Sequence, residues 1–156
     1  RNGYQMKKHF IIDGNNLIGK IPKLWNMQLK NKQSSREQLV MQLERYFFNK
    51  KIKVSLHFDG HESNHIGGRG IKIIYSENTT ADNRIKDEIS YAKNPKHITV
   101  ISSDMNVLDF ARVNSCSIIK SEQFAAEMNK KDNVEDEEVL TKSIDNEEMK
   151  RLFGIE

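Results

Sequence analysis

With 156 residues, the chain is long enough for one domain that buries roughly two thirds of its unfolded surface. Its mean hydropathy of -0.71 and its charged fraction of 30% are typical of a globular protein, and no apolar run approaches the ~18 residues of a membrane span, so membrane insertion is excluded. The one cysteine, Cys116, can form no internal disulfide, which fits a reducing compartment and predicts a cytoplasmic protein.

The charge is unevenly distributed along the chain. Residues 1–128 carry 20 Lys and Arg against 13 Asp and Glu, a net charge of +7, whereas residues 129–156 carry 5 against 9, a net charge of -4. A basic body suits a polyanionic partner, and an ordinary solvated lysine surface is the alternative. Residues 1–5 are expected to be an expression remnant, and no signal-peptide pattern precedes the first strand.

The first half of the chain predicts three strands and one helix. A short apolar strand ends at Asp13, where the turn-forming sequence DGNN begins. Apolar residues at helical spacing predict a helix over residues 34–49, capped by Ser34 or Ser35. The second strand ends in Asp59-Gly60, and a glycine-rich surface loop separates it from the third strand. The three strands are expected at residues 8–13, 53–58 and 71–75, the helix at residues 34–49 and the loop at residues 61–70.

The second half alternates helices with strands. Thr79 or Thr80 caps a helix that runs to about Lys93, where Asn94-Pro95 ends it. The segments expected after it are a strand, a helix, a strand and a last body helix, at residues 97–101, 105–113, 117–119 and 123–128. This order predicts a three-layer α/β/α domain with a mostly parallel central sheet, over residues 6–128.

The segment after Met128 differs in composition. Residues 129–138 are rich in charge and are expected to form an acidic connector, and Ser143–Phe153 has the spacing of a short amphipathic helix. We expect that helix to pack on the body or on a second subunit, so a homodimer is one possibility.

Four aspartates carry the main functional signal. Asp13, Asp59 and Asp104 follow apolar strand-like runs, and Asp82 begins a helix. The carboxyl ends of the strands of an open α/β sheet meet at one crevice, so these side chains are expected to converge. Two unit charges ~4 Å apart repel by about 4 kcal/mol at an effective dielectric of 20, so such a cluster requires protons or a divalent cation. The pattern therefore predicts phosphoester chemistry.

The motifs IIDGNNLIG, HFDG, TTADNRIKDEI and ITVISSD, in this order, resemble the NYN branch of the PIN-like ribonucleases, and in particular the YacP-like group. The match extends from Lys8 to Met128. The resemblance implies a PIN-like (Rossmann-like) α/β/α fold and metal-dependent endonucleolytic cleavage of single-stranded RNA. It also implies a partner in ribosome-associated messenger RNA.

On the family pattern, Asp13 is the central metal ligand, Asp82 and Asp104 complete the metal cluster, and Asp59 lies close beside it as a fourth catalytic residue. Carboxylate oxygens suit Mg²⁺ or Mn²⁺, which would generate a nucleophilic water and stabilise the leaving 3′ oxygen, so that products carry a 5′ phosphate. A zinc site is disfavoured because His57, His61 and His65 have the spacing of a strand followed by a loop.

Each of these aspartates also has a purely structural interpretation. Asp13 and Asp59 each precede a glycine, as aspartates in turns commonly do. Asp82 would lie in the first turn of a helix, where its charge complements the helix dipole, and Asp104 would be a helix N-cap. The four together favour a site, because independent caps have no reason to gather at one end of a sheet.

The candidate RNA-binding residues are amide, hydroxyl and basic side chains around the predicted crevice, namely Asn16, Lys20, Lys23, Arg69, Lys72 and Ser103. Trp25 can stack on a base, but packing onto the core as a lid is the stronger expectation. The loop at residues 61–70 is either a substrate-closing loop or a plain connector.

The predicted function is that of a metal-dependent endoribonuclease. The alternative of another class is a non-catalytic RNA-binding module of the same fold. A phosphatase with an aspartyl nucleophile fits poorly, because Asn15 stands where such enzymes carry a second aspartate.

Overall fold

The computed structural model describes residues 7–134 and contains a parallel five-stranded sheet. Its spatial order is β3-β2-β1-β4-β5, and each neighbouring pair is parallel. The strands are β1 (Lys8–Asp13), β2 (Ile52–Phe58), β3 (Ile71–Tyr75), β4 (Ile98–Ile101) and β5 (Ser117–Ile119). The predicted α/β fold with a parallel central sheet is confirmed.

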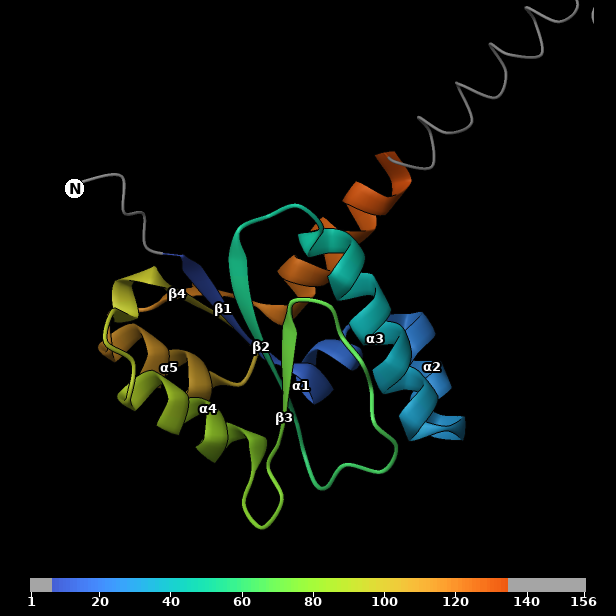
Figure 1. Ribbon diagram of the computed structural model, residues 1–156, viewed down its shortest axis with the longest axis horizontal. Helices are drawn as coiled ribbons and strands as arrows, with labels where there is room; N and C mark the ends of the chain where they lie inside the picture. The colour runs from blue at the N-terminus through green and yellow to red at the C-terminus, as the bar shows by residue number, and fades with distance from the viewer. Residues whose placement is uncertain (1–6, 135–156) are drawn as a thin grey trace, which may run out of the picture. The chain divides into compact units, whose positions relative to one another are not determined.

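Helices cover both faces of this sheet, as Figure 1 shows, with α1, α2 and α3 on one side and α4 and α5 on the other. Their bounds are α1 (Gly14–Ile18), α2 (Pro22–Lys30), α3 (Lys32–Phe47), α4 (Ala81–Ser90) and α5 (Met105–Val113), with a 3-10 turn η1 at Pro95–His97. The sheet is thus the middle layer of three.

The central strand β1 supplies core side chains to both layers because successive residues of a strand point to opposite faces. Ile11 packs in an apolar cluster with Ile85 of α4 and Val107 of α5. On the opposite face, the Phe10 ring lies 5.3 Å from that of Phe47, in α3, in an edge-to-face contact. Burial on both faces explains the three consecutive apolar residues Phe10–Ile12 in β1.

The helices between β1 and β2 differ from expectation. The sequence predicts a turn after Asp13, yet α1 begins at Gly14 and α2 follows at Pro22, where proline suits the first turn of a helix. The predicted cap of α3 is wrong as well, because the side chain of Asn31 accepts the hydrogen bond from the Ser34 amide at 3.0 Å. Ser35 is fully buried, and its hydroxyl donates to the Leu24 carbonyl at 2.9 Å, which ties α3 to α2.

The end of the described chain is helical over residues 121–134, so the predicted helix at 123–128 is confirmed and extended, whereas residues 129–134 form no irregular connector. The chain divides into two units after Ala125. Residues 135–138 of the predicted connector and the predicted helix at Ser143–Phe153 lie outside the described residues, and the domain boundary proposed after Met128 stays a prediction.

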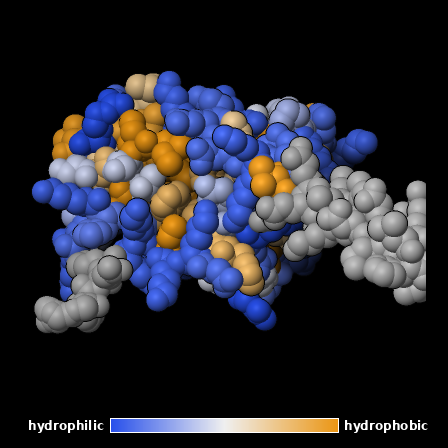
Figure 2. Space-filling view, turned by 90° about the horizontal axis from the view of Figure 1, so that it is seen from above, coloured by the Kyte–Doolittle hydropathy of each residue, from blue (hydrophilic) through white to orange (hydrophobic). Residues whose placement is uncertain are grey.

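The surface in the space-filling view is mostly hydrophilic, with hydrophobic residues gathered mainly in one area of the visible face (Figure 2). Among residues 7–134, no helix has the length and apolar character needed to cross a bilayer.

Candidate functional site

The site lies where the strand order of the sheet reverses. β1 and β4 are neighbours, with Ile12 paired to Ile101, but the helices that follow the two strands cover opposite faces. The chains therefore diverge at the carboxyl ends of these strands, which is where open α/β sheets form a crevice. Asp13 ends β1 and Ser102 directly follows β4, so both stand at this point.

Asp13 is a buried carboxylate at the centre of the site, with 4% of its surface exposed. Its pKa is raised from 3.8 to about 6: burial is the largest cause and the negative charges of Asp82 and Asp59 add to it, while a hydrogen bond from Ser102 opposes these effects. The Ser102 hydroxyl donates this bond to Asp13 Oδ2 at 2.8 Å. A buried carboxylate among like charges is poised to take up a proton or a cation.

Asp82, in the first turn of α4, and Asp104, the N-cap residue of α5, interact through their side chains. Burial raises the pKa of Asp82, and the charge of Asp104 and a hydrogen bond between the two carboxyls raise it further. Asp104 has a structural role too, because its Oδ1 accepts from the Asn106 amide at 2.8 Å and so caps α5. The cap interpretation of Asp104 is therefore confirmed, and its role as a metal ligand stays a prediction.

Asp59 contributes charge to the site but is held by structural contacts. Its Oδ1 accepts from the Ala81 amide at 2.9 Å, which fixes the start of α4, and its own amide donates to Asn15 Oδ1 at 2.8 Å. Its carbonyl accepts a bond of 2.6 Å from the guanidinium of Arg36. Asp59 thereby holds α4, and with it Asp82, next to the end of β1.

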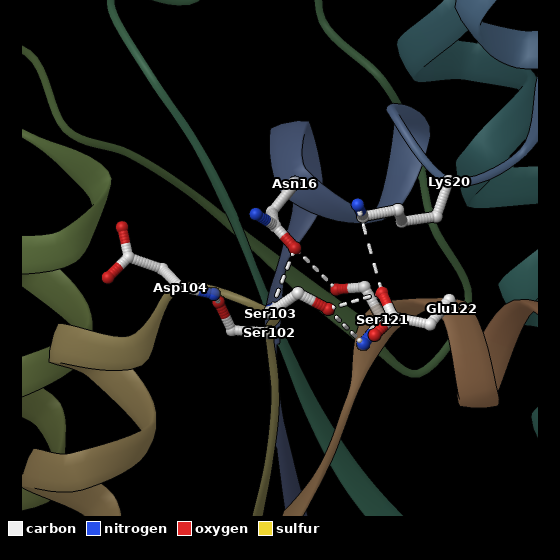
Figure 3. A network of polar contacts seen from close by, with 7 residues as sticks. All are labelled: Asn16, Lys20, Ser102, Ser103, Asp104, Ser121 and Glu122. Atoms are coloured by element: carbon white, nitrogen blue, oxygen red, sulfur yellow. Dashed lines mark hydrogen bonds and ion pairs between the residues drawn. The ribbon is translucent and has the colours of Figure 1, made fainter.

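A polar network adjoins Asp104 and includes three of the predicted RNA-binding residues, Asn16, Lys20 and Ser103 (Figure 3). Asn16 Oδ1 accepts from the Ser103 amide at 2.9 Å and from the Ser121 hydroxyl at 2.7 Å. The Ser103 hydroxyl donates to Glu122 at 2.7 Å. The Asp104 carboxylate projects away from this network in the view, so Asn16 and Ser103 form the border of the acidic site. Because both bonds to Asn16 use its oxygen, neither occupies its amide NH₂ group.

The basic candidates fall into two groups. Lys20, in the turn after α1, lies 3.8 Å from Glu122 and so belongs to the border of the site, and Lys23 is exposed in α2. Lys72 is on the edge strand β3, level with Ile11 and two strands from it, and Arg69 precedes that strand. The structure does not bring Arg69 and Lys72 to the acidic crevice, and their binding of RNA stays a prediction.

Two contacts of the site were missed from the sequence. Ser102 is fully buried and touches both Asp13 and the Asp104 amide, the latter at 3.1 Å, although the sequence pointed to the neighbouring Ser103. The signal in the sequence was the position of Ser102 directly after the predicted strand at residues 97–101, level with Asp13 at the end of the first strand. Arg36 is only 3% exposed and stacks on the Phe58 ring, with 4.8 Å from its guanidinium carbon to the ring centroid. Helical periodicity gave no indication of this inward-facing arginine.

The carboxylates of the site can bind a divalent cation, but they are not arranged in advance as a complete set of metal ligands. Within residues 7–134, no group of three or more His, Cys, Asp or Glu side chains is positioned to hold a metal ion together. Mg²⁺ keeps several waters and commonly binds proteins through one or two carboxylates and a substrate phosphate. Asp13, Asp82 and Asp104 offer oxygen ligands of this kind. Burial and, after it, the charges of neighbouring aspartates raise the pKa values of Asp13 and Asp82, and a cation would favour their ionised forms.

The histidines give no support for zinc. His57 is 1% exposed, and its Nε2 lies 2.7 Å from Glu88 Oε1, so this nitrogen is engaged in a hydrogen bond. His61 and His65 are exposed in the irregular loop before β3.

Comparisons with known proteins agree with this architecture. The model of the YacP-like NYN domain family matches residues 10–153. The chain belongs to the YacP-like NYN domain family. Membership indicates a nuclease-like, RNA-related function.

Solved structures of a family member share the fold of this YacP-like chain. The crystal structure of the W164L mutant of Rae1 (YacP) from Bacillus subtilis has a TM-score of 0.74 at 21% identity, covering 88% of this chain and 84% of that one. A second crystal structure of Rae1 (YacP) from the same organism has a TM-score of 0.70 at 19% identity, covering 93% and 87%. A search of curated proteins found no match.

Proposed function

We propose that this YacP-like protein is a metal-dependent endoribonuclease that hydrolyses phosphodiester bonds of single-stranded RNA. The observation that supports the proposal is the grouping of acidic side chains near the reversal point of the sheet, where the charge of Asp82 acts on the buried Asp13 and the charge of Asp104 acts on Asp82. Asp59 adds a fourth negative charge. Isolated turn formers and helix caps have no reason to raise one another's pKa values.

In the proposed mechanism Asp13, Asp82 and Asp104 would hold Mg²⁺ or Mn²⁺ together with water and an RNA phosphate, since their side chains alone do not form a complete set of ligands. A bound ion would supply a nucleophilic water of lowered pKa and charge neutralisation for the leaving oxygen. Ser102 holds the Asp13 carboxylate in one orientation through its 2.8 Å hydrogen bond. The amide NH₂ of Asn16 borders the site and can donate to a substrate phosphate, and exposed Lys20 adds positive charge beside it.

The test is cleavage of a labelled single-stranded RNA with Mn²⁺ or Mg²⁺ and with a chelator. We expect metal-dependent cleavage with 5′-phosphate ends, reduced at least a hundredfold in Asp13→Asn. The matched control is Asp109→Asn, since this aspartate of α5 is exposed and pairs with Arg112 on the surface at 3.3 Å. Binding of RNA without cleavage by the unaltered chain, in either metal, would instead establish the alternative of a non-catalytic RNA-binding module.

A further inference from the structure

Helix α2 presents two large apolar side chains to solvent. Trp25 is 44% exposed and Leu29 is 68% exposed, and they lie one helical turn apart. Trp25 therefore packs onto the core only in part, and the expectation that it forms a lid is only partly met. Leu24, on another side of the helix, is fully buried and provides the contact with the core.

The exposed residues of α2 form two parallel rows. Residues three and four apart on a helix share a face, so Pro22, Trp25 and Leu29 form an apolar row. The adjacent row, shifted by one residue, consists of the exposed residues Lys23, Asn26 and Lys30. We call the two rows together the α2 face.

The charge of this segment has one sign. From Gly14 to Arg36 the sequence contains four lysines and one arginine but no aspartate or glutamate. Arg36 is buried, which leaves the lysines as the exposed charges, namely Lys20, Lys23, Lys30 and Lys32. An exposed aromatic ring on a helix whose exposed charges are all lysines suits a ligand with a flat apolar group and a polyanionic backbone.

The α2 face begins next to the acidic site. Lys20 stands in the turn that joins α1 to α2, and its ammonium group lies 3.8 Å from Glu122, which accepts a hydrogen bond from Ser103. Ser103 precedes Asp104 in the chain, and Figure 3 shows Lys20 and Asp104 on opposite sides of this network. A strand of nucleic acid that leaves the acidic site over Asn16 and Lys20 would reach α2 next.

The position of α2 is fixed by the fold. Its Leu24 carbonyl accepts from the buried Ser35 hydroxyl of α3, and Asn31 caps α3 immediately after α2 ends. A rigid helix loses little conformational entropy when a ligand binds to it.

We propose that the α2 face is a docking surface for single-stranded RNA, with the Trp25 ring stacked on a base and Lys23 and Lys30 at phosphates. This proposal rests on the proposed function, because it takes the same substrate. Base stacking is tolerant of sequence, and lysines contact phosphates as point charges, so the surface would add affinity with little sequence preference. A second copy of the chain suits this face less well, because a two-fold contact would oppose like charges.

Trp25 is the single tryptophan of the chain, so its fluorescence reports on this surface alone. We would titrate the full chain with a twelve-nucleotide oligouridylate in the presence of a chelator, which prevents metal-dependent cleavage. Stacking predicts saturable quenching of Trp25, weakened by salt. Inorganic polyphosphate, which has no bases, is expected to compete for the lysines without reproducing the full quenching.

Variants separate the two rows. With fluorescently labelled oligouridylate and anisotropy detection, Trp25→Leu should weaken binding about tenfold, whereas Trp25→Phe, which keeps a ring, should retain most of the affinity. The double variant Lys23→Gln/Lys30→Gln should reduce the slope of log affinity against log salt by about 1.4, because each phosphate that a lysine no longer neutralises lowers the slope by ~0.7. The matched control is Lys93→Gln/Lys96→Gln, whose exposed lysines lie between α4 and β4.

The outcomes distinguish this proposal from the nuclease assignment. RNA cleavage with unchanged affinity in Trp25→Leu and in the Lys23/Lys30 variant would overturn the docking surface and leave the nuclease intact. Quenching with the expected losses, in a chain that cleaves no RNA, would support the docking surface alone. Concentration-dependent dimerisation that is lost in Leu29→Lys, without RNA binding, would assign the α2 face to a second copy and overturn the proposal.

Discussion

Ser102 and Asp13 are 89 residues apart in sequence, yet the Ser102 hydroxyl donates to Asp13 Oδ2 at 2.8 Å. The same oxygen of Ser102 accepts from the Asp104 amide at 3.1 Å. One buried hydroxyl therefore links the aspartate that ends β1 to the aspartate that caps α5. This contact orients Asp13 and limits the rise of its pKa.

Ser102→Ala should weaken cation binding and lower stability. The change removes the partner of a buried carboxylate oxygen, so we expect a loss of about 1–3 kcal/mol in the free energy of unfolding. Asp13 would ionise less readily, and the affinity for Mn²⁺ should fall at neutral pH. Urea denaturation and calorimetric titration with Mn²⁺ measure the two effects, with Ser90→Ala, at the exposed end of α4, as the control. Unchanged Mn²⁺ affinity would separate Ser102 from the site.

Asp13→Asn should stabilise the metal-free protein at neutral pH. The pKa of Asp13 is raised from 3.8 to about 6, so folding favours its protonated form. The corresponding stability is fully present below pH 4 and is lost as the pH rises through about 6, by about 3 kcal/mol for two pKa units. An uncharged amide avoids this loss. Denaturation in chelator should show Asp13→Asn more stable than the unaltered chain at pH 8, and the gap should close at pH 4.

If the free energies of unfolding of Asp13→Asn and the unaltered chain differed by the same amount at pH 4 and at pH 8, this result would contradict a raised pKa of Asp13. Added Mn²⁺ gives a second comparison, since it should raise the melting temperature of the unaltered chain more than that of Asp13→Asn.

The sequence predicted the parts of this site that depend on strand ends. The limits of β1, β3, α5 and β5 agree with the predicted segments, because apolar runs with clear stops encode them. The approach of Asp82 to Asp104 was predicted because Asp104 follows a strand and Asp82 begins a helix at the same edge of the sheet. Helical periodicity did not predict α1 and α2, because both helices are short and place few side chains in the core.

Contacts between distant polar residues were beyond sequence reasoning. The inward turn of Arg36 depends on the Phe58 ring and the Asp59 carbonyl, which only the folded chain brings to α3. The pairing of Glu88 with His57 likewise joins α4 to β2 across 31 residues of sequence. No local pattern distinguishes these residues from the exposed charges beside them.

Glu88→Gln should destabilise the fold at neutral pH by about 1–3 kcal/mol, since it weakens charge-assisted hydrogen bonds. Burial opposes ionisation of Glu88, but hydrogen bonds with His57, His9 and Ser55 outweigh it and hold its pKa well below the usual 4.5. A depressed pKa gives stability that is present above pH 4.5 and lost as the pH falls below it. The difference between the variant and the unaltered chain should therefore shrink in acid.

Urea denaturation at pH 7, 5 and 3 measures this trend, and Asp87→Asn, a neighbour on α4, is the control. Because Glu88 also anchors the helix that carries Asp82, the variant should bind Mn²⁺ less tightly at pH 7. A variant as stable as the unaltered chain at pH 7 would show that the buried cluster adds nothing to the fold.

Gly14 and Gly19 provide a matched pair that tests how closely α1 packs behind Asp13. A Cβ at Gly14 would lie 2.6 Å from the His57 carbonyl oxygen and 2.7 Å from the Phe58 ring, whereas at Gly19 the nearest atom is 3.4 Å away. Gly14→Ala should cost about 1–3 kcal/mol of stability through overpacking and should lower RNA cleavage, because backbone movement there displaces Asp13. Gly19→Ala should be neutral or stabilising by about 0.4–1 kcal/mol, since its backbone is already helical. Thermal unfolding and cleavage assays of both variants check this, and equal effects at the two positions would mean that the contact between α1 and β2 does not position the site.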